Sequence, residues 1–132
     1  MKVSAFLLPV LLFASPALAQ SNMGAEAFQE YVTGKTLTFS SDGVIYGVEE
    51  YLSDRRVRWS FVEGECKYGR WYEEGGQICF VYEDGAGPQC WTFRQGSEGL
   101  VARFSDDPPG SDLYETRQTD EPLQCPGPEV GV

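Results

Sequence analysis

The four cysteines are the residues whose spacing says most about chemistry. Cys79 and Cys90 lie in ICFVYEDGAGPQCW (78–91), where two aromatic and β-branched runs flank a loop of acid, glycine and proline. A thioredoxin-type redox pair needs C-x-x-C at the start of a helix, and a four-cysteine zinc site needs closely spaced pairs. Neither spacing occurs in this sequence, so we expect all four cysteines to form structural disulfides.

Four cysteines allow three pairings, and sequence alone does not select one. If a tight turn at EGG (74–76) and a loop around EDGAGP set the register, Cys79 stands directly opposite Cys90 on neighbouring antiparallel strands, at a separation suited to a disulfide. Adjacency therefore favours Cys79 with Cys90, which leaves Cys66 with Cys125. A bridge between Cys66 and Cys79 is disfavoured because this register holds them apart.

The sequence contains no histidine. Histidine is the usual general base for serine and cysteine nucleophiles and the commonest zinc ligand. Hydrolases with a histidine base and histidine-containing zinc sites are therefore excluded. No glycine-rich phosphate loop leads into a helix. We expect no catalytic residues and no enzyme activity.

Acidic residues recur in pairs, as two-carboxylate catalysis would require, but such catalysis needs a cleft in which burial raises the pKa of one acid. Most of these pairs lie at predicted strand ends or turns, so we expect solvated, ionised carboxylates. The loops DDPPGSD (106–112) and YEDGAG (82–87) lack the ligand spacing of an EF-hand calcium loop. We therefore expect no metal and no cofactor. The pairs are Glu49 with Glu50, Glu73 with Glu74, Glu83 with Asp84, and Asp106 with Asp107.

Arg55, Arg56 and Arg58 form the one basic concentration in the sequence. We expect them on the outer face of a strand, beside Glu49 and Tyr51. Cross-strand ion pairs are a more ordinary role there than an anion site.

Residues 1–19 have the order of a secretory signal: Lys2, an apolar run (5–13), and a small-residue site ending at Ala19. Cleavage would leave Gln20 as the new N-terminus. The apolar run is too short to span a bilayer, and no other segment reaches about 20 apolar residues, so we expect no membrane contact after cleavage. No cysteine follows the site for lipid attachment. The short, nearly chargeless segment before the apolar run is typical of bacterial leaders, so the periplasm is the expected location, with secretion as the alternative.

The chain of 132 residues carries 10 basic and 20 acidic side chains, a net charge of -10. Removing Lys2 with the leader leaves 9 basic residues and a charge of about -11. Such a field repels nucleic acid and anionic lipid and attracts basic proteins. Solubility of an exported domain explains the same acidity without any partner.

After the leader, GAEAFQEYVTG (24–34) spaces its apolar residues at helical intervals, so one short helix is predicted at about 24–33, with Ser21 or Asn22 available as its cap. From Lys35 onward the period is two, with turn residues every eight to twelve positions. Eight strands are predicted, at 36–40, 44–52, 56–62, 66–73, 77–82, 89–94, 99–105 and 112–117.

Loops this short join antiparallel neighbours. Eight sequentially paired strands leave two open edges unless the last meets the first. We therefore predict an all-β, up-and-down meander closing into a small lipocalin-like barrel (20–120) with the N-terminal helix. A two-layer sandwich and a bent open sheet are the alternatives. Residues 121–132 form a proline- and glycine-rich tail, which Cys125 would tie back to the barrel.

The predicted register places aromatic residues on one, inward face of the barrel. A filled core is the ordinary outcome in a barrel of this size. The alternative is a ligand cavity lined by some of these side chains. The candidate lining residues are Trp59, Trp71, Phe80, Trp91 and Phe93.

The run GRWYEEGGQICFVYEDGAGPQCW (69–91) resembles uncharacterised exported domains of Gram-negative bacteria. The shared pattern is G-x-W, then C-F, then C-W, which here comprises Gly69, Trp71, Cys79, Phe80, Cys90 and Trp91. The resemblance implies a lipocalin-like periplasmic barrel and carries no active residues. In size, acidity and barrel class alone, the chain is also similar to periplasmic lysozyme inhibitors.

Two functional hypotheses follow. The first is a non-catalytic binding or envelope-interaction domain whose acidic surface meets a basic protein. The second is a carrier of a small apolar ligand in a tryptophan-lined barrel interior.

Overall fold

The computed structural model of the protein describes residues 21–62, 64–105, 107–108 and 110–125, with residues 1, 10 and 12–14 near the N-terminus. Most of the predicted leader, the predicted new N-terminus Gln20 and residues 126–132 of the predicted tail lie outside these residues.

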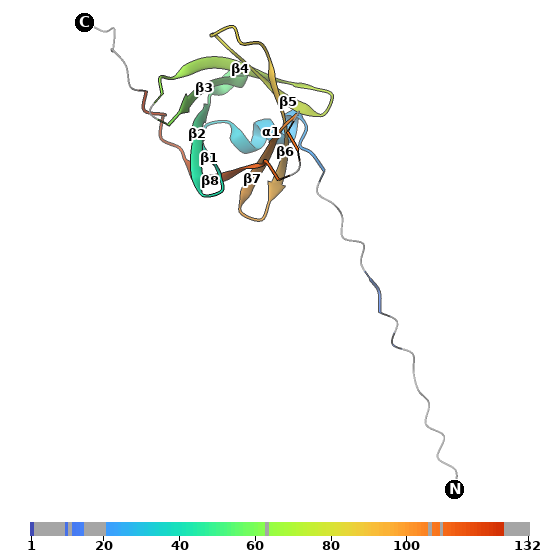
Figure 1. Cartoon of the computed structure of the whole chain (residues 1–132). Helices are drawn as coiled ribbons and strands as arrows, with labels where there is room; N and C mark the ends of the chain where they lie inside the picture. Colours follow the sequence, from blue (N-terminus) through green and yellow to red (C-terminus); the bar gives the residue numbers. More distant parts are fainter. Residues whose placement is uncertain are drawn as a thin grey trace, which may run out of the picture.

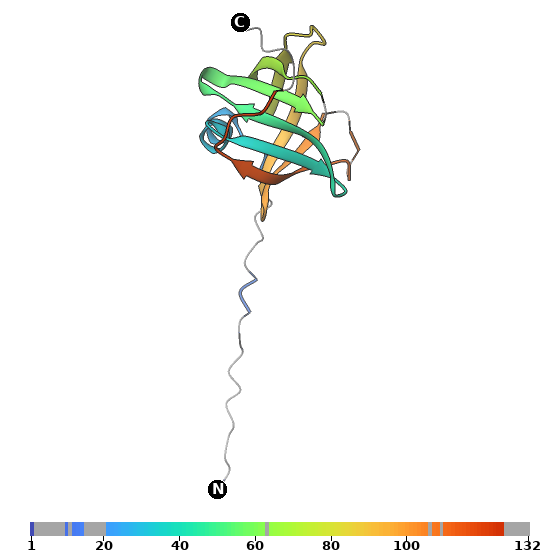
Figure 2. The ribbon, with the colours of Figure 1, turned by 90° about the vertical axis from the view of Figure 1, so that its left-hand side faces the viewer.

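An antiparallel barrel is covered at one end by one short helix (Figure 1, Figure 2). Within the described residues, the chain forms α1 (Ala25–Val32), β1 (Thr36–Ser41), β2 (Val44–Tyr51), a 3-10 turn (Ser53–Arg55), β3 (Arg56–Phe61), β4 (Lys67–Glu74), β5 (Gln77–Tyr82), β6 (Gln89–Gly96), β7 (Gly99–Phe104) and β8 (Leu113–Thr119). Strand β1 pairs with both β2 and β8, so the sheet closes. The predicted barrel is confirmed, and the sandwich and open-sheet alternatives are wrong.

The central hairpins have the predicted register. Trp71 pairs with Phe80 on β4 and β5, and Cys79 lies directly opposite Cys90 on β5 and β6. Cys79 and Cys90 form a disulfide, and Cys66 forms the second one with Cys125. The favoured cysteine pairing is therefore confirmed.

Helix α1 lies across one end of the barrel (Figure 2) and is held there by apolar packing. Phe28 and Val32 are fully buried. The Phe28 ring centroid lies 5.0 Å from that of Trp71 and 4.6 Å from that of Phe93. An isolated helix of eight residues is marginal in water, whereas burial of each such side chain contributes roughly 1.5–3 kcal/mol. Tertiary packing therefore stabilises α1.

Polar contacts from the barrel fix both ends of α1. The Ala25 N–H donates to the Glu73 carboxylate at 2.7 Å, so the expected cap from Ser21 or Asn22 is wrong. Near the other end, the Tyr31 hydroxyl donates to Glu115 Oε2 at 2.7 Å. Burial and Glu115 raise the pKa of Tyr31 to about 12, so Tyr31 stays a donor at neutral pH.

The segment after β8 runs back over the outside of the barrel. The Leu123 N–H donates to Glu50 Oε2 at 3.2 Å, and the Thr36 hydroxyl donates to the Glu121 carbonyl at 2.7 Å. Two residues after Leu123, Cys125 forms its disulfide with Cys66. The described part of the C-terminal segment is thus tied to the barrel.

Candidate functional site

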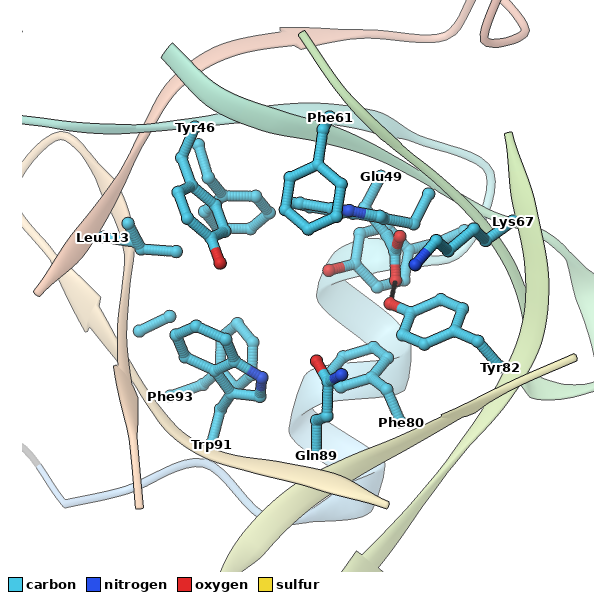
Figure 3. A pocket seen from close by; sticks show the side chains of 14 residues that line it. Tyr46, Glu49, Phe61, Lys67, Phe80, Tyr82, Gln89, Trp91, Phe93 and Leu113 are labelled. Atoms are coloured by element: carbon cyan, nitrogen blue, oxygen red, sulfur yellow. Dashed lines mark hydrogen bonds between the residues drawn. The ribbon is translucent and has the colours of Figure 1, made fainter. Parts of the chain in front are cut away.

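A half-open pocket lies inside the barrel, with α1 behind its floor (Figure 3). Phe80 and Phe93 line the pocket, and their ring centroids lie 6.4 and 4.6 Å from that of Phe28 on the helix. The helix therefore closes the barrel below these two rings. The pocket is lined by Phe39, Tyr46, Glu49, Tyr51, Trp59, Phe61, Lys67, Phe80, Tyr82, Gln89, Trp91, Phe93, Ala102 and Leu113.

The pocket leaves about 60 Å³ for the centres of water-sized molecules. One buried water needs about 10–15 Å³ on this measure. The enclosed part therefore has room for several waters or for the head of a small ligand, whose remaining atoms would occupy the mouth.

Four of the five candidate lining residues surround this pocket: Trp59, Phe80, Trp91 and Phe93. Trp71 does not line it. Its indole is buried against Phe28 and lies under the Arg55 guanidinium, 4.6 Å from the ring centroid. The barrel interior thus has two parts: a solid aromatic core next to α1, and a pocket at the end of the barrel away from α1.

Two glycines make room for pocket side chains on neighbouring strands. A Cβ at Gly47 would collide with the Trp59 ring, and a Cβ at Gly69 would lie 2.8 Å from Tyr82 Cδ1. Each aromatic ring therefore lies flat against the strand that carries the glycine. Gly47 positions the Trp59 indole, and Gly69 positions Tyr82 with its hydroxyl toward Glu49.

Glu49 is the acidic residue of the pocket lining, and sequence reasoning missed it. It is directly opposite Trp59 on β3 and so faces inward, with only 2% of its surface exposed. Tyr82 donates its hydroxyl to Glu49 Oε1 at 2.8 Å, whereas Oε2 has no hydrogen-bond partner. The predictions of a solvated Glu49 carboxylate and of its place on the outer face are therefore wrong.

Burial governs the protonation of this pair. It raises the pKa of the Glu49 carboxyl well above its usual value, and the hydrogen bond from Tyr82 opposes the shift only in part. Burial and Glu49 likewise raise the pKa of Tyr82. The Tyr82 hydroxyl therefore remains a donor at neutral pH, and Glu49 has a greater affinity for a proton than an exposed glutamate.

Lys67 contributes a positive group at the pocket, on the same side as Glu49 and Tyr82 (Figure 3). Its ammonium donates to Oδ2 of Asp84 at 2.7 Å, and Asp84 belongs to the loop between β5 and β6, outside the barrel interior. The same ammonium lies 5.6 Å from the Phe61 ring centroid. The Lys67 charge is thus already paired with a carboxylate.

The arginine cluster has structural contacts. Arg58 Nε donates to Glu50 Oε1 at 2.6 Å, which is the expected cross-strand ion pair but with Glu50 in place of Glu49. Arg55 Nε donates to the Gln29 side chain at 3.1 Å, and Arg56 donates to Ser53. Glu50 is also buried, so solvation was the wrong expectation for this acid as well.

No group of three or more metal-ligating side chains comes together among the residues that the structure describes. Asp106, from one of the acidic pairs, lies outside those residues. In the described part of the chain, no helix has both the length and the apolar character needed to cross a membrane. The two disulfides indicate an oxidising compartment outside the cytoplasm.

In comparisons with protein-family models, curated proteins and solved structures, the chain matches none of them.

Proposed function

We propose that this protein is a non-catalytic binding protein that carries a small, largely apolar ligand in the pocket of its barrel. The observation that supports this proposal is the half-open aromatic pocket, with Trp59 and Trp91 on its walls and a polar group at Glu49. Small-molecule sites commonly combine apolar walls with a few oriented polar groups.

Tryptophan fluorescence tests the proposal, with 2-phenylethanol as the probe. Since Trp59 and Trp91 line the pocket, a bound ring should change their emission saturably. Ala102 also lines the pocket and is buried, so Ala102→Leu should fill the space and abolish the response while thermal melting remains cooperative. A wild-type protein that gives no saturable response to 2-phenylethanol, or to analogues with an amine or a carboxylate in place of the hydroxyl, would contradict the proposal.

A basic protein partner is the second candidate. The net charge of -10 would attract such a partner. Three apolar side chains of this acidic protein are also exposed and available for contact: Val44 (70%), Ile45 (51%) and Val62 (58%). Pull-down from periplasmic extract at low salt should recover a basic protein that Val44→Ser/Ile45→Ser loses. Recovery of the same proteins by the double variant would contradict this role for the apolar side chains.

We propose the periplasm as the location, with secretion as the alternative, on the basis of the leader pattern and the two disulfides. Membership of the exported small-barrel family remains a proposal based on the G-x-W, C-F and C-W pattern. Fractionation of a bacterial host, with immunodetection of the chain, tests the location; recovery with the cytoplasm would contradict it.

A further inference from the structure

Glu49 presents a carboxyl oxygen without a hydrogen-bond partner to the pocket. Its Oε1 is already hydrogen-bonded by Tyr82, and its Oε2 is the one buried side-chain nitrogen or oxygen without a partner among the residues the structure describes. Buried polar groups are nearly always paired, and leaving one unpaired is costly. A ligand donor placed in the pocket would supply the missing partner.

Aromatic rings form the adjoining wall. The ring centroids of Tyr46, Trp59 and Phe61 lie 5.4–5.8 Å from one another, and the rings are tilted or edge-on. Trp91 lies across the pocket from Phe61 (Figure 3). The faces of such rings carry partial negative charge and attract cations. The same walls also accommodate the apolar part of a ligand.

We infer that the pocket binds a primary ammonium carried on an apolar stem, with the ammonium donating to Glu49 Oε2 and the stem packed among the aromatic rings. This inference rests on the proposed function, since it names the class of ligand for the same pocket. The geometry gives the ligand one charge-assisted hydrogen bond at its head and apolar contact along its length.

Other ligand charges fit this pocket less well. An anion would face the Glu49 carboxyl, and Lys67, the cation of the lining, is already paired with Asp84. A neutral alcohol would donate to Oε2 but would gain no charge pair. The groups that face Glu49 are the Tyr82 and Tyr51 hydroxyls and the Lys67 ammonium, together with the Trp59 ring.

Isothermal titration calorimetry separates these ligands. The probes are phenethylamine, 2-phenylethanol and phenylacetate, which share one ring and differ in the head group. We expect phenethylamine to bind roughly ten-fold or more tightly than the alcohol, the factor expected of one charge-assisted hydrogen bond. The ammonium pairs with the ionised carboxylate, whereas burial raises the pKa of Glu49 and so favours its protonated form. At a pH where the free protein holds this proton, the amine should displace it to the buffer, so that the binding enthalpy depends on the ionisation enthalpy of the buffer.

Glu49→Gln removes the charge but keeps the shape, so it should abolish the preference for the amine and the buffer dependence while 2-phenylethanol still binds. Glu74→Gln is the matched control, because Glu74 is an exposed acid at the end of β4. It should bind all probes as the wild type does. An amine preference that survives in Glu49→Gln would overturn the inference.

The same ammonium ends a lysine side chain, so a blocked lysine peptide forms a second arm. If the peptide binds in a Glu49-dependent way and phenethylamine does not, the site is assigned to a lysine side chain of a protein. If phenethylamine binds and the peptide does not, the site is assigned to a free amine. Both outcomes support an ammonium ligand. Equal binding of amine, alcohol and anion would overturn the inference and leave the proposed carrier function standing. Failure of every probe to bind would overturn both.

Discussion

Replacing Glu49 with glutamine should remove a pH dependence of stability. Glu49 is buried with Oε2 unpartnered, and burial raises its pKa in the folded protein above the value of about 4.3 for an exposed glutamate. Below that pH, both folded and unfolded chains hold the proton. As the pH rises above it, the unfolded chain releases the proton and the folded chain keeps it, so the free energy of unfolding falls. The fall ends when the pH passes the folded-state pKa.

One proton held only by the folded state gives a slope of about 1.4 kcal/mol per pH unit. Urea unfolding at a series of pH values from about 5 upward measures this slope. The free energy of unfolding of the wild type, relative to Glu49→Gln, should fall by that amount per unit, whereas the difference between wild type and Glu74→Gln should show no such fall. Parallel profiles for wild type and Glu49→Gln would exclude a raised pKa of Glu49 in the folded protein, because they would mean that Glu49 has the same pKa in the folded and unfolded states.

Three further perturbations test the framework around the pocket. Replacing Cys66 and Cys125 with serine opens a loop with a sequence separation of 59 and should lower the free energy of unfolding by about 4 kcal/mol in the chain-entropy model, as measured by urea unfolding; an unchanged midpoint would contradict it. In Gly47→Ala the new methyl group should collide with Trp59, lower the free energy of unfolding by about 1–3 kcal/mol and shift the tryptophan emission. An unchanged emission spectrum would mean that Gly47 does not position the Trp59 indole. Tyr31→Phe removes a donor to a buried carboxylate and should lower the melting temperature through a loss of about 1–3 kcal/mol; equal melting curves would exclude this tie between α1 and the barrel.

The hairpins from β4 to β6 were predictable because their turns are short. The EGG turn sets the register of β4 and β5, which places Tyr72 opposite Cys79. The loop around EDGAGP sets the register of β5 and β6, which places Cys79 opposite Cys90. The position of the helix relative to the barrel was not predictable from the sequence. The amphipathic pattern shows that α1 has an apolar face, but whether that face covers the barrel or enters it depends on the volume that the strands enclose.

The inward position of Glu49 could not be read from β2 alone. VIYGVEEY has apolar residues at successive positions, so neither face is marked by alternation. The turn before β3 contains Asp54 and Arg55 with positive φ, which is not one of the short hairpin turns that fix a register. The pairing of Glu49 with Trp59 would have indicated the inward position, but this pairing is known only once the register of β2 and β3 is known. The register of β1 also shifts near Phe39 against both of its neighbours, β2 and β8, and the sequence of β1 does not mark these shifts.

If the barrel interior holds a ligand pocket beside a solid core, the three indole N–H signals should respond differently in an NMR titration with phenethylamine. Trp59 and Trp91 line the pocket, whereas Trp71 is buried against the helix. We expect saturable shifts of the Trp59 and Trp91 signals with little change at Trp71. Shifts of all three signals alike, or of none, would contradict it.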